Sequence, residues 1–173
     1  FPEQAVNWND MTKAIKNARR EIKVLNLFAY TGGASVVCAK AGAKVTHVDA
    51  SKGMVERARE NARLNDITTI RYIVDDCQKF IEREIRRGNF YDAIIMDPPS
   101  YGRGTNGEMW KLEDNLYDFV ALTKKVLSDK PLFVLISSYT TGLQASVLKN
   151  ILTLIFGEGN IDADEIGLPT DEK

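Results

Sequence analysis

Hydrophobic and polar positions along the chain follow two alternating periods. Short apolar runs of strand length are followed by segments in which apolar residues recur every three or four positions, the spacing of an amphipathic helix. Glycines such as Gly42 and Gly88 mark helix ends. Strands are predicted at 23–28, 44–48, 70–74, 90–96 and 131–136, with 160–166 as a candidate sixth. Helices are predicted at 8–20, 34–41, 52–64, 77–87, 112–127 and 142–156.

This repeated strand–helix order is typical of an α/β protein with a mainly parallel sheet. The strands are nearly continuous apolar runs, which indicates a sheet covered on both faces. With 173 residues the chain is too short for a (β/α)₈ barrel, which needs about 250. We therefore predict a Rossmann-like, doubly wound sheet with helices on both faces. We divide the chain into an N-terminal helical segment (1–20) and a ligand-binding domain (21–173).

Composition narrows the classes of function. The net charge of −1, from 23 basic and 24 acidic residues, gives no global electrostatic argument for nucleic acid. No apolar stretch approaches the roughly 20 residues of a membrane span. With two cysteines and one histidine, we expect no metal site and a reducing, cytoplasmic setting. Because the chain begins at Phe1, we expect residues 1–20 to be the end of an upstream part.

Acidic and polar residues follow the predicted strands, and the carboxyl ends of parallel strands share one edge where ligands bind. Asp49 follows the second strand, at the position where nucleotide-binding sheets hold a ribose; the alternative is a carboxylate that stabilises the next helix. Asp76 follows the third strand and is a candidate for an adenine amine or for a helix N-cap, with Asp75 as competitor. Gly32 and Gly33 let the backbone approach a ligand closely.

The fourth strand runs into Asp97-Pro98-Pro99-Ser100, the strongest local feature. Two prolines hold the backbone extended and remove two N–H donors, which leaves fixed carbonyls beside the Asp97 carboxylate. Such acceptors suit an amino group or a planar ring. Tyr101 follows this turn directly, and Tyr139 follows the fifth strand. The glycine-rich loop 101–107 is expected to form a mobile lid, in which Arg103 either contacts a phosphate or is simply exposed to solvent.

These residues resemble the class I S-adenosylmethionine-dependent methyltransferases, and more narrowly the bacterial large-subunit ribosomal RNA methyltransferase group. The resemblance rests on FPEQAVNW (1–8), LFAYTGGAS (27–35), Asp49, Asp76, DPPSYGRGTNGEMWKL (97–112) and SSYTTG (137–142). It implies the class I methyltransferase fold and S-adenosylmethionine as cofactor. The implied cofactor-binding residues are Phe28, Ala29, Tyr30, Thr31, Gly32, Gly33, Asp49, Ala50, Asp76, Cys77 and Asp97. The implied catalytic residues are Asp97, Pro98, Pro99 and Tyr101.

Three positions depart from the family pattern. Asn26 stands where the first motif usually opens with an acid, and Tyr30 stands where it usually has a glycine. A tyrosine adopts a positive φ only at a cost, so we expect the loop to turn mainly at Gly32 and Gly33. The stretch after the fifth strand lacks the cysteine expected of enzymes that methylate C5 of cytosine, and Cys77 is expected to pack or to begin a helix.

The resemblance implies an enzyme that methylates a base of ribosomal RNA, and we expect Tyr101 or Tyr139 to stack on that base. RNA affinity would come in part from an upstream segment, because this chain is nearly neutral. Two alternatives remain open at this point: methylation of a small molecule or protein, and a non-catalytic module that binds S-adenosylmethionine. The adjacent glycines without G-x-G-x-x-G argue against a dehydrogenase, since little is present to hold a pyrophosphate.

Overall fold

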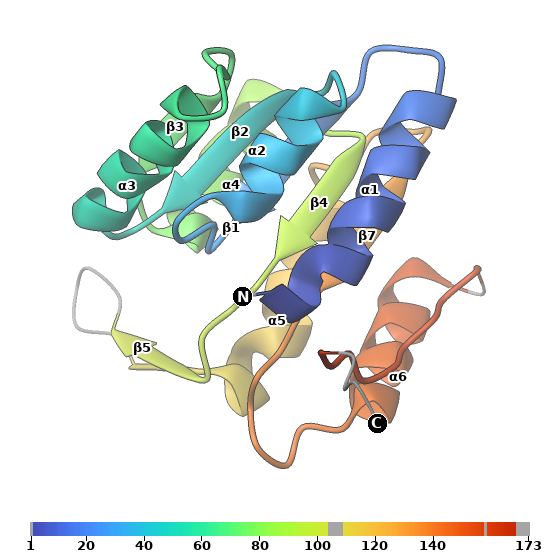
Figure 1. The fold of residues 1–173 in the computed structure, drawn as a ribbon. Helices are drawn as coiled ribbons and strands as arrows, with labels where there is room; N and C mark the ends of the chain where they lie inside the picture. Colours follow the sequence, from blue (N-terminus) through green and yellow to red (C-terminus); the bar gives the residue numbers. More distant parts are fainter. Residues whose placement is uncertain (1, 104–108, 158, 169–173) are drawn as a thin grey trace, which may run out of the picture.

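A computed structural model describes residues 2–103, 109–157 and 159–168 (Figure 1). Its five-stranded sheet has the order β3-β2-β1-β4-β7, and all neighbouring pairs are parallel. The strands are β1 (Lys23–Leu27), β2 (Lys44–Asp49), β3 (Arg71–Val74), β4 (Ala93–Met96) and β7 (Phe133–Ile136). From β1 the chain builds the sheet outward through β2 to β3, and then returns to the other side of β1 to add β4 and β7. This change of direction is the mark of a doubly wound sheet, so the predicted α/β fold is confirmed.

Helices cover both faces of this sheet. One face carries α1 (Ala5–Asn17), α2 (Gly33–Lys40) and α3 (Lys52–Arg63), preceded by the short helix η1 (Pro2–Gln4). The other face carries α4 (Cys77–Arg87), α5 (Leu112–Lys124) and α6 (Ala145–Phe156). Alternate residues of one strand enter the two cores: Ile94 and Met96 of β4 face α4 and α5, whereas Ala93 and Ile95 face α1 and α2.

The N-terminal helix packs on the domain that follows it. Met11 and Ile15 of α1 are buried in the same core as Val36 of α2 and Val24 of β1. The boundary between 1–20 and 21–173 remains a prediction about the sequence. In the described structure α1 nevertheless belongs to the helical layer that covers one face of the sheet.

Two predicted features differ from the structure. Residues 160–166 form no strand; Asn160 and Ile161 instead line a small apolar cavity of about 240 Å³ beside β7 and α6. The predicted loop after Ser100 contains a two-stranded antiparallel hairpin, β5 (Tyr101–Arg103) and β6 (Met109–Lys111). The lid expected over 101–107 lies mostly in residues 104–108, outside the described residues, as does the side chain of Arg103.

Candidate cofactor and acceptor site

A cavity of about 690 Å³ opens at the carboxyl ends of β1, β2 and β4. Its volume lies in the range of small-molecule and cofactor pockets. Its lining includes Phe28 and Tyr30 after β1, Asp49, Ala50 and Ser51 after β2, Asp76, Cys77, Gln78, Lys79 and Glu82 of the α4 end, Asp97, Pro98, Pro99 and Ser100 after β4, and Tyr139 after β7. The four acids outnumber the single lysine among these residues, so the cavity favours a ligand that carries positive charge.

The loop after β1 is backbone-strained and is held by its neighbours. Phe28 and Tyr30 have φ values of 52° and 49°, in the left-handed region that costs a non-glycine residue about 1–2 kcal/mol. The N–H of Phe28 donates to Cys77 Sγ (3.3 Å), and the N–H of Tyr30 donates to Asp49 Oδ2 (2.9 Å). The expectation that Tyr30 would avoid a positive φ is therefore wrong, because Asp49 and Cys77 supply the hydrogen bonds that offset the strain.

The two glycines of this loop face helices in the structure. At Gly32, which has φ 81°, a Cβ would lie 2.9 Å from the Cβ of Ala58 in α3. At Gly33, a Cβ would lie 3.0 Å from the indole of Trp8 in α1. Neither glycine lines the cavity, and neither do Ala29 and Thr31. Their assignment to the cofactor stays a prediction, while close helix packing is a sufficient physical reason for both glycines.

Asp49 holds both the loop and the next helix. Its Oδ2 accepts from Tyr30 N, and its Oδ1 accepts from Ser51 N at 2.8 Å. Each carboxylate oxygen retains lone-pair capacity after accepting one N–H, so both remain able to accept from a ligand's hydroxyls. The side chain of Ser51 accepts from Met54 N and caps α3. Asp49 therefore combines its structural role with a position on the cavity wall.

Asp76 and Asp75 have different surroundings. Asp76 Oδ1 caps α4 by accepting from Lys79 N at 3.0 Å, and Asp76 also lines the cavity. Asp75 is ion-paired with Arg83 and is absent from the lining. The two interpretations of Asp76, as a cap and as a ligand of an adenine amine, are compatible because only one of its oxygens is used by the cap.

Three aromatic side chains, Phe28, Trp110 and Phe119, form an aromatic wall of the cavity, and of these the sequence indicated only Phe28 as a site residue. Phe28 contacts Phe119 of α5 and Trp110 of β6 with ring centroids 5.2 and 5.7 Å apart. The indole Nε1 of Trp110 donates to the carbonyl of Pro99 (2.7 Å), which anchors the hairpin to the Asp97-Pro98-Pro99 turn. The sequence signal was the apolar spacing that placed Phe119 on the buried face of its helix. Trp110 lies between the predicted loop at 101–107 and the predicted helix at 112–127, where no element was expected.

Of the four acids that line the cavity, Asp97 is the one without a hydrogen-bond partner among the described residues. Within the described part of the chain its carboxylate has no hydrogen bond or ion pair, although it is partly buried. Burial raises the pKa of the Asp97 carboxyl from 3.8 to about 6, and the charge of Glu3 adds to the increase. Pro98 and Pro99 supply no N–H that could satisfy it locally. The group is thus available to a ligand at the junction of cavity and solvent.

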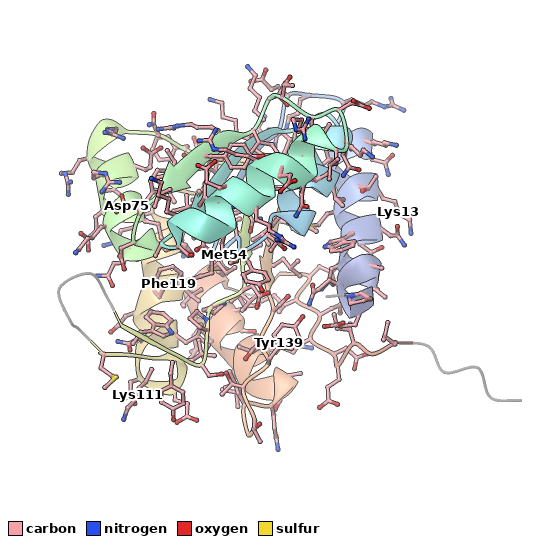
Figure 2. All side chains as sticks on the ribbon, turned by 60° about the vertical axis from the view of Figure 1, so that its left-hand side comes forward. Lys13, Met54, Asp75, Lys111, Phe119 and Tyr139 are labelled. Carbon is pink, nitrogen blue, oxygen red and sulfur yellow. The ribbon has the colours of Figure 1, made fainter. Side chains whose placement is uncertain are left out.

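Residues of the predicted acceptor side are only partly brought together. Asp97, Pro98, Pro99 and Tyr139 all line the cavity, as does Phe119, which is labelled with Tyr139 in Figure 2. Tyr101 does not line it; its side chain is 69% exposed on β5. Of the two tyrosines expected to stack on a base, Tyr139 therefore has the better position, while the role of Tyr101 stays a prediction.

A buried polar chain lies beneath the loop, where the family pattern has an acid. Asn26 Nδ2 donates to Ser35 Oγ (2.9 Å), and Ser35 Oγ bonds His47 Nδ1 (3.0 Å). Burial lowers the pKa of His47 to about 4, so the imidazole is neutral at physiological pH. The chain ties β1 to α2 and β2 without a buried charge. This explains how Asn26 can replace the acid structurally.

The cysteines show no sign of an activated thiolate. Both are free and buried, and burial raises the pKa of Cys38 to about 12 and that of Cys77 further. Cys77 begins α4, as predicted, and accepts from Phe28 N. In the described residues no group of three His, Cys, Asp or Glu is placed to hold a metal ion, and no helix is long and apolar enough to cross a membrane.

Comparisons with known proteins agree with this geometry. Residues 9–119 match the family model of S-adenosylmethionine-dependent methyltransferases. The chain belongs to this family. S-adenosylmethionine is therefore the cofactor against which the site is tested. The volume of the cavity suits a molecule of this size, its acids suit the ribose hydroxyls and the amino groups, and its aromatic wall suits the adenine ring.

Several relatives are ribosomal RNA methyltransferases. Ribosomal RNA large subunit methyltransferase I of Aeromonas salmonicida is 37% identical over 53% of this chain and 24% of its own length. Ribosomal RNA large subunit methyltransferase K/L of Pseudoalteromonas translucida is 34% identical over 68% of this chain and 17% of its own length. The chain thus spans about a quarter or less of these relatives.

Solved structures extend the likeness over more of the chain. The S-adenosylmethionine-dependent methyltransferase from Agrobacterium tumefaciens is 45% identical, with a TM-score of 0.84, over 88% of this chain and 49% of that one. A methyltransferase structure complexed with SAH is 25% identical, with a TM-score of 0.75, over 94% of this chain and 41% of that one. These structures confirm the class I methyltransferase fold.

Proposed function

We propose that this chain is the catalytic domain of an enzyme that methylates a base nitrogen of ribosomal RNA. The observation that carries the proposal is the unpaired Asp97 carboxylate, which shares one cavity with Asp49 and Asp76. The names of the large-subunit ribosomal RNA methyltransferases among the relatives supply the substrate class.

Binding of the cofactor falls to the half of the cavity nearest β2 and α4. Asp49 would accept from the ribose hydroxyls, Asp76 from the adenine amine, and Phe28 with Phe119 would cover the ring. S-adenosylmethionine supplies an electrophilic methyl group on a sulfonium, and the acids of the lining suit its positive charge. Ala29, Thr31, Gly32 and Gly33 would act through the shape of the loop.

The acceptor half contains Asp97 and Pro98. Asp97 would accept a hydrogen bond from an amino group of the base and align the nitrogen lone pair with the methyl carbon. When the nitrogen–carbon bond forms and the carbon–sulfur bond breaks, the nitrogen must lose a proton, and a carboxylate with a pKa of about 6 is able to take it up. Alignment of the reacting atoms can lower the barrier by about 7–11 kcal/mol.

The buried cysteines support nitrogen over carbon as the acceptor. Methylation at C5 of a pyrimidine needs a thiolate that adds to the ring first, whereas both cysteines here have raised pKa values and Cys77 Sγ is already used by Phe28 N. A base nitrogen needs no such nucleophile. The base would have to be unpaired or flipped to reach the cavity.

Two measurements test the proposal separately. Thermal unfolding with S-adenosylmethionine or SAH at 100 times its Kd should show about 2.7 kcal/mol of added stability, with NAD as the control ligand. Labelled methyl transfer to ribosomal RNA from cells that lack the gene, followed by nucleoside analysis, should place the methyl on a base nitrogen. Label on ribose, on C5 or only on protein or small molecules would refute the assignment even if the cofactor binds.

A further inference from the structure

The strongest unexplained contact joins the start of the chain to the acceptor side of the cavity. The hydroxyl of Tyr139 accepts from Gln4 Nε2 and donates to Glu3 Oε1, each at 2.9 Å. These bonds connect residues 135 and 136 positions apart in sequence. Both hydroxyl functions of Tyr139 are therefore engaged by η1, a segment outside the sheet.

Gln4 is itself held on its other side. Its Oε1 accepts from Asn7 Nδ2 in α1 (2.9 Å) and from Ser137 Oγ after β7 (3.3 Å). The amide thus uses both its donor and its acceptor atoms, which fixes its orientation and gives the bond to Tyr139 a definite direction. An amide clamped in this way is unlike an ordinary surface glutamine, whose side chain samples many rotamers.

The ring that these contacts orient faces the reacting end of the cavity. Tyr139 lines the cavity with Asp97. Burial raises the pKa of the Tyr139 phenol, and the hydrogen bond to Glu3 and the charge of Asp97 add to the increase. The side chain is 51% exposed, so packing alone does not fix it. Without the two hydrogen bonds, the ring would be expected to change rotamer on a fast timescale.

We infer that Gln4 and Glu3 are positioning residues that hold the Tyr139 ring as a fixed wall for the methyl-accepting base. The inference rests on the proposed function for the identity of the acceptor. It assigns the residues before α1 to the acceptor half of the site, where a planar ring stacks on Tyr139 beside Asp97. Neither Gln4 nor Glu3 lines the cavity, so their effect on the acceptor base is expected to be separate from cofactor binding.

A double-mutant cycle tests the inference with the full chain. Gln4→Ala should lower kcat/KM for RNA about threefold to tenfold, mainly through KM for RNA, with an unchanged Kd for SAH. Tyr139→Phe, which keeps the ring and removes the hydroxyl, should cause a similar loss. Gln4→Ala added to Tyr139→Phe should then cost nothing further. Additive losses, or an equal weakening of SAH binding, would overturn the inference.

A matched control and a second readout keep the test independent of activity. Asn150→Ala removes an exposed amide from α6, remote from these contacts, and should change kcat/KM less than twofold. With 3-fluorotyrosine at position 139, Gln4→Ala should shift the fluorine resonance, whereas Asn150→Ala should not. An unmoved resonance would refute the positioning role. Absent RNA methylation by the wild type with a shifted resonance would instead refute the proposed substrate.

Discussion

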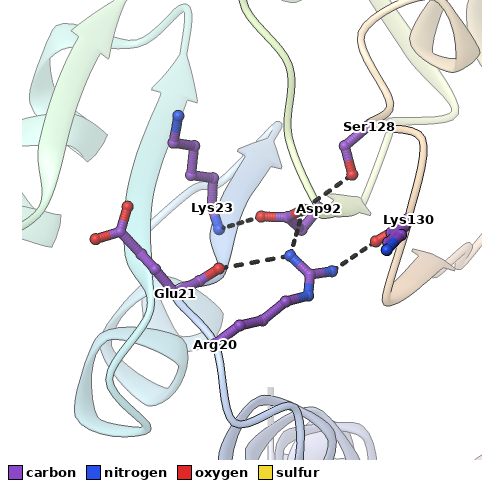
Figure 3. A network of polar contacts seen from close by, with 6 residues as sticks. All are labelled: Arg20, Glu21, Lys23, Asp92, Ser128 and Lys130. Carbon is purple, nitrogen blue, oxygen red and sulfur yellow. Dashed lines mark hydrogen bonds and ion pairs between the residues drawn. The ribbon is translucent and has the colours of Figure 1, made fainter.

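Two aspartates five positions apart flank the same buried strand and have opposite environments. Asp92 precedes β4, at the amino edge of the sheet, and Asp97 follows it at the carboxyl edge. Asp92 accepts from Arg20 Nη1 (2.7 Å), Lys23 N (2.9 Å) and Ser128 Oγ (2.9 Å), as Figure 3 shows. Asp97 has no such partner among the described residues.

The pKa values follow this difference. Burial raises the pKa of Asp92, but its hydrogen bonds from Lys23, Arg20 and Ser128 outweigh burial and leave the pKa below its ordinary value. At Asp97 burial dominates and the pKa rises to about 6. One edge of the sheet thus uses its acid to join segments of the chain, while the other edge leaves its acid for a ligand.

Asp97→Asn should have the greatest effect, and that effect should fall on activity. The substitution keeps the shape of the side chain and removes its charge and proton affinity, so kcat should fall about 10²–10³-fold. Stability should not fall, because a partly buried charge without a partner is lost. Steady-state methyl transfer and urea unfolding measure the two quantities; full activity in this variant would remove the basis of the proposed mechanism.

The reverse pattern is expected from Asp92→Asn. The asparagine amide would place N–H groups against the donors that now bind the Asp92 carboxylate. The free energy of unfolding should therefore fall by about 2–3 kcal/mol, a value that allows for the partial exposure of Arg20. SAH affinity of the folded protein should be unchanged. Asp10→Asn, in an exposed pair with Lys13, is the control and should change stability by less than about 0.5 kcal/mol.

The two acids should also give stability opposite dependences on pH. The folded state binds the Asp97 proton more tightly than the unfolded chain does, so this acid's contribution is most favourable below 3.8 and is lost as pH rises through about 6. The contribution of Asp92 is present above 3.8 and is lost as pH falls through its lowered folded-state pKa.

Urea unfolding of the wild type and both asparagine variants, from about pH 4 to pH 7, measures this difference. Between these two pH values the free energy of unfolding of the wild type, measured relative to that of Asp97→Asn, should fall by about 1 kcal/mol after allowance for solvent screening. Relative to Asp92→Asn, it should hold its advantage across the neutral range. Parallel curves for the two variants would contradict the environments described.

Apart from the control Asp10→Asn, Arg20→Lys should have the least effect of these substitutions. Arg20 bridges Asp92 to the carbonyl of Lys130 through its Nη2 (2.5 Å), and a lysine can keep the charge without making both contacts at once. The free energy of unfolding should fall by about 1 kcal/mol. Arg20→Gln should lose more than Arg20→Lys, and equal losses would mean that charge is irrelevant to the network.

The positions of the strands and of the acids at the carboxyl edge of the sheet could be predicted from local sequence pattern. The apolar periods predicted the strands within a few residues, and parallel order then placed Asp49, Asp76 and Asp97 at one edge. Motif resemblance identified the family, which the comparisons confirm. Backbone strain could not be predicted in this way: the positive φ of Tyr30 depends on Asp49, nineteen residues away, and no local rule for tyrosine predicts it.

Two sequence predictions were wrong: the loop after Ser100, which contains the β5–β6 hairpin, and the sixth strand at 160–166. Residues 101–107 have the composition of a glycine-rich loop. Beyond them, Trp110 contacts Phe28 and Phe119 and donates to the Pro99 carbonyl, and these contacts stabilise the pairing of β5 with β6. Residues 160–166 have some strand character in sequence, yet they form no ladder in the described structure. In the hairpin tertiary contacts outweighed local pattern, whereas residues 162–166 are exposed and pair with no strand.

Periodicity and motifs are local, so the linear chain was enough to establish the order of elements, the family and the acids that gather at the carboxyl edge. Three other outcomes came from the folded arrangement: which acid is paired and which is free, which glycines face helices, and the contact of Gln4 with Tyr139. These depend on groups far apart in the chain, whose distances and burial exist only once the sheet is assembled.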